Sequence, residues 1–244
     1  MKNEDRSLAI IFDLDGVLVD TVEAHFLGWS AVARNLGVLF SRRDNDSLRG
    51  VSRRDALAWL AGNQWPLPPK QEKFLLNLKA SIYRRELSEQ DARISIAGVT
   101  RLLKELKCLQ FLVGVASASR HASLLLEKAG IADAVDVVSD GHFAGKVKPH
   151  PDQLLHVARQ LERSPDCCVV IEDSTVGLEA ARRAGMRCIA IGTAAITIDM
   201  VTRLPSLENV SATTLLRILD PEAKSNTPLQ SISFLRPSKD LSTR

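Results

Sequence analysis

Short apolar runs alternate with longer amphipathic runs from Leu8 onward, and this alternation restricts the fold of the 244-residue chain more than any other feature. Such alternation is typical of parallel strands joined by crossover helices. The expected fold class is therefore α/β, with a doubly wound (Rossmann-like) parallel sheet. Strands are predicted at Leu8–Asp13, Phe111–Ala116, Val135–Ser139, Cys168–Glu172 and Cys188–Ile191. Helices are predicted at Gly98–Leu106, Arg120–Ala129, Pro151–Leu161 and Thr175–Ala184.

The segment from about residue 22 to residue 91 interrupts this alternation, because it has helical patterns and no convincing strand. We therefore predict a core domain of residues 1–21 and 92–220, a helical cap domain of residues 22–91 inserted after the first strand, and a flexible tail of residues 221–244. Cap helices are predicted at Val22–Leu36, Arg53–Ala61 and Lys70–Leu87. The cap core is expected to contain Trp29, Trp59 and Trp65.

The composition is that of an ordinary globular protein, with 45% hydrophobic and 25% charged residues. The 32 basic and 29 acidic residues are interspersed, so no basic stripe indicates nucleic-acid binding. No apolar run approaches the length of a membrane span, and the charged N-terminus lacks a signal-peptide pattern. We expect a cytoplasmic monomer that acts on a small molecule. Four cysteines without metal-site spacing are expected to be reduced core residues, Cys108, Cys167, Cys168 and Cys188.

The first predicted strand runs directly into two aspartates, Asp13 and Asp15, which are followed by Gly16. Side chains of a strand repeat every two residues, so both carboxylates are expected on one side of the strand end, close enough to share a cation. A hard ion such as Mg²⁺ binds carboxylate oxygens and leaves room for a substrate phosphate, which indicates phosphoryl chemistry. The alternative is an ordinary Asp-Gly turn with Asp13 as its cap.

Three further polar sites lie at predicted strand ends or helix starts. Ser117 follows an apolar run, where its hydroxyl and the next two amides suit a phosphate oxygen, unless the serine only caps a helix. Lys148, which precedes a proline, would lend positive charge to a phosphoryl group, although such a lysine is commonly solvated. Glu172 and Asp173 follow another strand, and Asp173 would either complete a metal site or cap the next helix.

Together these sites supply each part that transfer of a phosphoryl group to a carboxylate requires. Asp13 would attack the phosphorus, and Asp15 would act as general acid and base. The order of motifs, from DLDG through Ser117 and Lys148 to the acidic pair, resembles the haloacid dehalogenase superfamily over Leu8 to about Leu219. The helical insert occupies the position of the small cap domain of that superfamily.

Within the superfamily, the chain resembles the β-phosphoglucomutase family in four segments, DLDGVLVDTVEAHFLGW, LRGVSRRDAL, VASASRH and VKPHPD. The resemblance implies a Mg²⁺-dependent enzyme that interconverts β-glucose 1-phosphate and glucose 6-phosphate through an aspartyl-phosphate and glucose 1,6-bisphosphate. It implies metal ligands at Asp13, Asp15, Glu172 and Asp173. It implies substrate contacts at Thr21, His25, Gly50, Val51, Arg53, Lys79, Ser117, Ala118, Ser119, His121 and Lys148.

The chain departs from the family pattern at Ala56, where a serine is usual, and at His121, where an asparagine is usual. Both departures are expected to affect the choice of sugar without changing the phosphoryl step. Arg49 and Arg54, neighbours of Arg53 in the segment LRGVSRRDAL, are expected to form a solvated face. Two other functions stay open at this point, a sugar-phosphate phosphatase with the same aspartates and a catalytically silent binding protein on the same fold.

Overall fold

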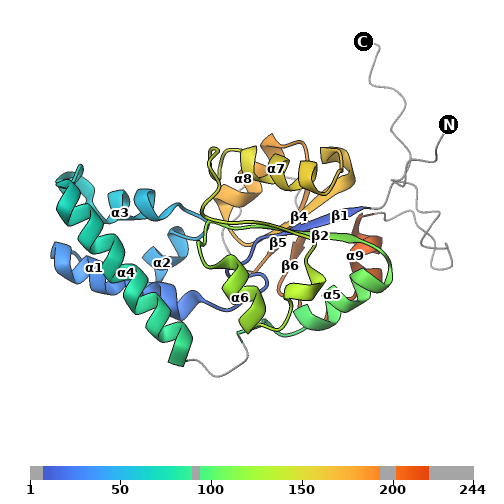
Figure 1. Ribbon diagram of the computed structural model, residues 1–244, viewed down its shortest axis with the longest axis horizontal. Helices are drawn as coiled ribbons and strands as arrows, with labels where there is room; N and C mark the ends of the chain where they lie inside the picture. Colours follow the sequence, from blue (N-terminus) through green and yellow to red (C-terminus); the bar gives the residue numbers. More distant parts are fainter. Residues whose placement is uncertain (1–7, 90–93, 193–201, 220–244) are drawn as a thin grey trace, which may run out of the picture.

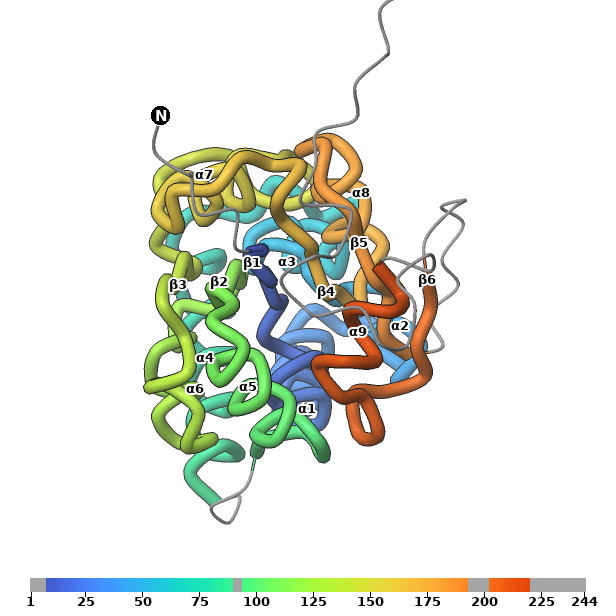
Figure 2. The backbone as a smooth tube through the Cα atoms, turned by 90° about the vertical axis from the view of Figure 1, so that its right-hand side faces the viewer, coloured from blue at the N-terminus to red at the C-terminus, as the bar shows by residue number. Residues whose placement is uncertain are grey.

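Six parallel strands form a single sheet in the computed structural model, which describes residues 8–89, 94–192 and 202–219 (Figures 1 and 2). The order across the sheet is β3-β2-β1-β4-β5-β6, so the chain winds outward in both directions from β1, as a doubly wound sheet does. The predicted α/β fold class is confirmed. The strands are β1 Ala9–Phe12, β2 Leu112–Ala116, β3 Val137–Ser139, β4 Cys168–Glu172, β5 Arg187–Ile191 and β6 Thr202–Leu204.

Helices cover both faces of the sheet, as Figure 1 shows. Side chains of β1 alternate between the two faces, with Ile11 packed under α7 and α8 and Phe12 packed over α5 and α6. This alternation produces two apolar cores, one on each side of a buried central strand. The helices of the sheet domain are α5 Val99–Cys108, α6 Ala122–Lys128, α7 Asp152–Gln160, α8 Thr175–Arg183 and α9 Ala212–Leu219. Short 3₁₀ turns lie at Gly62–Gln64, Ala132–Ala134 and Pro165–Cys167.

Four helices inserted after β1 form the cap, one more than the three predicted, and Figure 1 shows them beside the ends of the strands. Their apolar core is separate from those of the sheet and includes Val32, Leu57 and Leu75. No apolar pattern predicts α2, whose residues RRDNDS are all polar; a capping box between Ser41 and Asp44 starts this helix. The cap helices are α1 Val22–Leu36, α2 Arg42–Ser47, α3 Arg53–Ala61 and α4 Pro69–Glu89.

Two sequence predictions about apolar residues are wrong. Trp59 is 52% exposed on α3, so it does not belong to the cap core, whereas Trp29 is buried there and Trp65 packs against it. Cys108 is the last residue of α5 and is exposed. It lies outside the buried apolar face of that helix, to which Leu106 belongs. All four thiols are free, and Cys168 is buried in β4.

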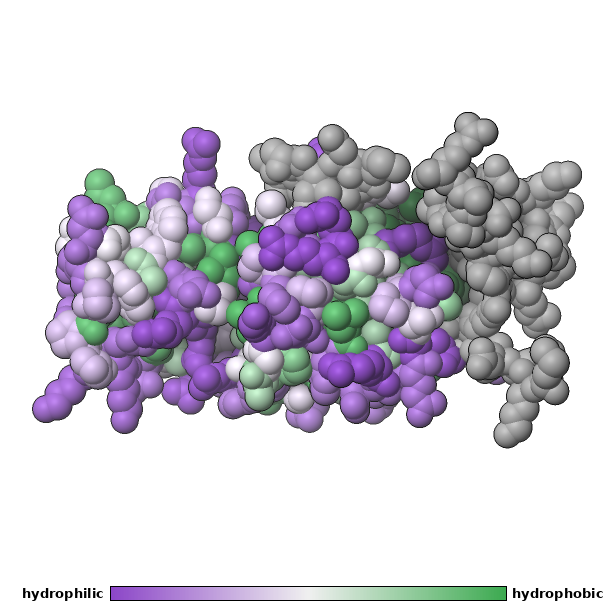
Figure 3. Space-filling view, turned by 90° about the horizontal axis from the view of Figure 1, so that it is seen from above, coloured by the Kyte–Doolittle hydropathy of each residue, from purple (hydrophilic) through white to green (hydrophobic). Residues whose placement is uncertain are grey.

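The surface carries mostly polar side chains. On the face above α7 and α8, hydrophilic residues surround small, separate apolar patches (Figure 3). Within the described parts of the chain, none of the helices combines the length and the apolar composition that crossing a membrane would need. The predicted tail of residues 221–244 lies outside the described residues.

Candidate active site

Three buried carboxylates meet where β1 and β4 end side by side in the sheet. Asp13 follows β1, Glu172 is the last residue of β4, and Asp173 comes next along the chain. One oxygen from each lies within 4.8 Å of the others. Burial and the neighbouring charge of Glu172 raise the pKa of Asp13 well above its ordinary value, and the same two causes raise that of Asp173 to about 6. The cluster therefore holds more negative charge than the protein alone balances.

Lys148 is buried within this cluster, so it is not the solvated lysine that stood as the alternative. Its ammonium donates to Asp13 Oδ1 at 2.5 Å, to Glu172 Oε2 at 2.7 Å and to the carbonyl of Ala116 at 2.9 Å. Three donors thus meet three acceptors, which fixes the position of the nitrogen. Burial opposes the charge, but the two carboxylates outweigh it and raise the pKa of Lys148 above its ordinary range. The lysine stays charged beside Asp13.

The donor set of this cluster fits a divalent cation. Carboxylate oxygens are the ligands that Mg²⁺ prefers, and a cation would relieve the repulsion that raises the pKa of Asp13 and Asp173. The carboxylate of Asp15 is not one of the three described acids in the cluster. Asp13 and Asp15 nevertheless line the same pocket, and the charge of Asp15 contributes to the raised pKa of Asp13, so Asp15 as a metal ligand stays a prediction.

The Asp15 carboxylate instead faces the cap. Thr21 donates to its Oδ1 at 2.5 Å, the Tyr83 hydroxyl lies 3.4 Å from Oδ1, and Ser117 Oγ lies 3.5 Å from Oδ2. His25 Nε2 lies 3.5 Å from Oδ1. Burial by itself would raise the pKa of Asp15, but the contacts with His25 and Thr21 and the charge of Lys79 outweigh it and lower the pKa to about 2. Asp15 is therefore ionised in this arrangement.

Two cap side chains extend this contact. Lys79, which is 4% exposed on α4, places its nitrogen 3.2 Å from His25 Nδ1 and 4.2 Å from the centre of the Tyr83 ring. Burial lowers the pKa of Lys79 to about 7, and burial with the charge of Lys79 also lowers that of His25. When Lys79 donates to Nδ1, neutral His25 carries its proton on Nε2, directed at Asp15.

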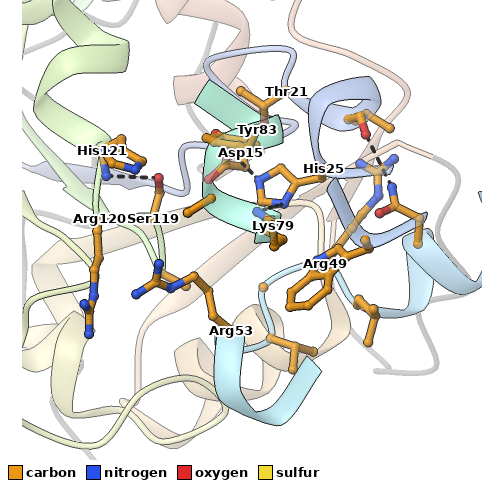
Figure 4. A pocket seen from close by; sticks show the side chains of 18 of the residues that line it. Asp15, Thr21, His25, Arg49, Arg53, Lys79, Tyr83, Ser119, Arg120 and His121 are labelled. Atoms are coloured by element: carbon orange, nitrogen blue, oxygen red, sulfur yellow. Dashed lines mark hydrogen bonds and ion pairs between the residues drawn. The ribbon is translucent and has the colours of Figure 1, made fainter. Parts of the chain in front are cut away.

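A pocket between cap and core contains most of the predicted site residues (Figure 4). The predicted residues that line it are Asp13, Asp15, Thr21, His25, Gly50, Val51, Arg53, Lys79, Ala118, Ser119 and His121. The other four, Ser117, Lys148, Glu172 and Asp173, are buried, and the contacts described above join them to Asp13 or Asp15.

Eight lining residues were not predicted, Val22, Trp29, Asn45, Leu48, Arg49, Ala80, Tyr83 and Arg120. Tyr83 lies one helical turn after Lys79, so the i, i+4 spacing on α4 was the signal for it. Arg49 was expected in a solvated face, but its Nη1 lies 2.6 Å from Asp173 Oδ2 because the loop before α3 reaches the core. Arg54 does lie in solvent, paired with Glu72 at 2.9 Å.

Gly50 explains how the cap loop comes so close. Its φ is +70°, and a Cβ atom there would lie 2.4 Å from Ser174 Oγ and 2.8 Å from Val176 Cγ2. Any larger residue would push the loop, and with it the pocket wall, away from the start of α8. Ser174, not Asp173, caps α8 by accepting a bond from Gly177 N at 3.1 Å, so the capping alternative for Asp173 is wrong.

The remaining local predictions concern Ser117 as a helix cap and the two departures from the family pattern. Ser117 is not a helix cap, since α6 begins only at Ala122 and the hydroxyl accepts from the Ser119 amide at 3.0 Å. Ala56 is buried in the cap core and does not line the pocket, whereas His121 does, stacked on Tyr83 with ring centres 6.3 Å apart. Of the two departures from the family pattern, only His121 changes the pocket wall.

The matches with known proteins agree with this geometry. A model of the haloacid dehalogenase-like hydrolase family matches residues 10–191, a span that includes β1, the cap, Lys148 and the Glu172–Asp173 pair. The chain belongs to the haloacid dehalogenase-like hydrolase family. The predicted superfamily is therefore confirmed.

Both mutases and phosphatases of this family are similar to the chain. It is 36% identical to the β-phosphoglucomutase of Bacillus subtilis over 189 residues, which cover 75% of the chain and 83% of that relative. It is 32% identical to hexitol phosphatase B of Escherichia coli over 197 residues, which cover 78% and 86%. The crystal structure of a β-phosphoglucomutase from Clostridium difficile superposes with a TM-score of 0.78 at 27% identity, covering 86% of this chain and 95% of that one.

Proposed function

We propose that this family member is a β-phosphoglucomutase, which interconverts β-glucose 1-phosphate and glucose 6-phosphate through an aspartyl-phosphate on Asp13 and a glucose 1,6-bisphosphate intermediate. The observation that carries the proposal is a second group of cations in the pocket, apart from the acidic cluster. A phosphatase needs one phosphate site. A mutase that handles a bisphosphate needs two.

The second anion site would be formed by Arg53 of the cap and Arg120 of the core, both of which line the pocket (Figure 4). Among the described residues, no carboxylate pairs with either arginine; Arg120 donates to the Gly141 carbonyl at 3.3 Å. Burial lowers the pKa of Arg53, and the neighbouring charge of Arg120 lowers it further. Two like charges without a carboxylate partner favour an anion between them, and a guanidinium can bind phosphate oxygens in pairs.

The transfer itself would use Asp13 and Asp15. An Asp13 oxygen forms a bond to phosphorus of the bisphosphate while the bond from phosphorus to the sugar oxygen breaks, and Asp15 gives that oxygen a proton. In the opposite direction a sugar hydroxyl attacks the aspartyl-phosphate and Asp15 takes its proton. The ionised Asp15 of this structure is ready for the second direction. Lys148 and Ser117 would bind the phosphoryl oxygens.

The cap would lower the pKa of Asp15. His25 and Thr21, which both follow the Asp13–Gly16 motif, lower the pKa of this carboxylate, and the charge of Lys79 assists them. If the cap helices move away, His25 and Lys79 leave, and the pKa of Asp15 rises toward its ordinary value. Mg²⁺ bound by Asp13, Glu172 and Asp173 would supply the charge that lets an anionic nucleophile approach an anionic phosphate.

A phosphatase is the second candidate, because hexitol phosphatase B and the fructose-1-phosphate phosphatase YqaB of Escherichia coli are 32% and 29% identical to the chain. Such an enzyme would use the same Asp13 and hand its phosphoryl group to water. The structure of the pocket favours a sugar as acceptor, since the cap residues His25, Lys79 and Tyr83 enclose Asp15.

The two candidates are separated by their products. The protein would be incubated with β-glucose 1-phosphate, Mg²⁺ and a trace of glucose 1,6-bisphosphate, and glucose 6-phosphate and free phosphate would be measured together. A mutase yields glucose 6-phosphate with little free phosphate. Phosphate release at a comparable rate would support the phosphatase instead. Asp13→Asn must lose both activities, and an Asp13→Asn protein as active as the parent would revive the silent binding protein.

A further inference from the structure

Every carboxylate of the acidic cluster already has a cation partner, and one of these partners comes from the cap. Lys148 pairs with both Asp13 and Glu172, while Arg49 donates to Asp173 Oδ2 at 2.6 Å. A divalent cation that binds Asp13, Glu172 and Asp173 would therefore bring its charge to a place where a guanidinium already lies.

The two cations differ in their freedom to move. Lys148 has a side chain that is 2% exposed and three acceptors from the core, so displacing it would leave two buried carboxylates unpaired. The Arg49 side chain is 30% exposed and has a second partner on its own helix turn, Asp46, whose Oδ1 lies 2.9 Å from Nη2. Arg49 can leave Asp173 and keep its ion pair with Asp46, so a bound metal ion would displace Arg49 and not Lys148.

Arg49 also lies at a contact between the two domains. It follows Leu48 and precedes Gly50, whose Cα approaches the start of α8 more closely than any side chain would permit. The contact from Arg49 to Asp173 therefore joins the cap loop to the residue beside that start. Whatever displaces Arg49 removes the ion pair that holds this loop on the core.

We propose that Arg49 is a positioning residue that competes with the divalent cation for Asp173, so that metal affinity and the seating of the cap loop are coupled. This proposal deepens the proposed function, on which it rests for the metal site itself. Because coupling is reciprocal, binding of the cation weakens the seating of the loop by the factor by which the seated loop weakens binding of the cation.

The test compares Mg²⁺ binding to the parent protein, Arg49→Met and Arg54→Met by isothermal titration at fixed ionic strength, with no sugar phosphate present. Methionine keeps much of the arginine stem and removes its charge. Arg54→Met is the matched control, because Arg54 is an exposed cap arginine that pairs with Glu72 and not with the core. A charge-assisted bond of this length predicts that Arg49→Met lowers the dissociation constant for Mg²⁺ about tenfold or more.

A second measurement follows the loop. Hydrogen exchange of the backbone amides of residues 48–52 should speed up when Mg²⁺ is added to the parent, and should be fast in Arg49→Met with or without Mg²⁺. The control should behave as the parent does.

An unchanged or weaker Mg²⁺ affinity in Arg49→Met, with the melting temperature of the control, would refute the competition while leaving the proposed function intact. If the parent itself binds no Mg²⁺, the metal site of the proposed function fails as well, and the mutase assay then decides that function separately. A misfolded Arg49→Met would be replaced by Arg49→Gln, for which the same tightening is expected.

Discussion

Replacing Lys148 by methionine tests how the acidic cluster is held together. The substitution removes a buried ammonium that donates to Asp13, Glu172 and the Ala116 carbonyl, and it leaves two buried carboxylates without their cation. Removing one partner of a buried ion pair costs about 3–5 kcal/mol. We expect Lys148→Met to lose an amount of this order in the free energy of unfolding at pH 7.5, measured with urea in the presence of EDTA.

The loss should depend on pH in a definite direction. Without Lys148, the pKa of Asp13 in the folded protein rises further above its unfolded value of about 4. The folded state then binds more protons than the unfolded state above that pH, so its stability falls as pH rises. The loss of unfolding free energy in Lys148→Met should therefore be smaller at pH 5.5 than at pH 7.5. At pH 7.5, Mg²⁺ should restore part of that free energy.

Lys146→Met is the control, because Lys146 is exposed two residues earlier in the same loop and should change stability by less than about 0.5 kcal/mol. A loss below about 1 kcal/mol in Lys148→Met, equal at both pH values, would mean that the two carboxylates are not held as buried charges. The explanation given for the cluster would then be wrong.

Three further outcomes follow from the site. Because burial lowers the pKa of Lys79 from 10.5 to about 7, the unfolded chain binds a proton that the folded chain has lost between these values, and stability should rise with pH there by at most about 1.4 kcal/mol per unit. Urea unfolding from pH 7 to pH 10 should lack this slope in Lys79→Met. Gln153→Leu should lower the unfolding free energy by about 1–3 kcal/mol, because the amide donates to the carbonyls of Ser117 and Ser139 from a buried position. Gly177→Ala places a Cβ 2.0 Å from the Glu172 carboxyl carbon, so calorimetric titration should find Mg²⁺ binding weakened about tenfold or more, and unchanged affinity would contradict the assigned ligand.

The site was predictable where local sequence and topology together decide it. Asp13, Glu172 and Ser117 each follow an apolar strand, and adjacent parallel strands bring their carboxyl ends to one edge of the sheet. Lys148 was identified from its place before a proline and Lys79 from the resemblance to the family, but the chemistry of both depends on burial that no sequence pattern states. Trp59 shows the opposite case, since an aromatic residue within a helical pattern lies on the outer side of α3.

The sequence by itself determined the sheet, most of its helices and the cap, because apolar periodicity is a local property that the backbone repeats of helix and strand convert directly into buried faces. It did not determine β6, a three-residue strand that exists through its pairing with β5, nor α2, which has no apolar face. Only the tertiary structure decided that Arg49 meets Asp173 and that Asp15 faces the cap. Arg49 and Asp173 are 124 positions apart, and their contact depends, as do the contacts of Asp15 with the cap, on how the two domains meet. The charges and pKa values of the site follow from that arrangement.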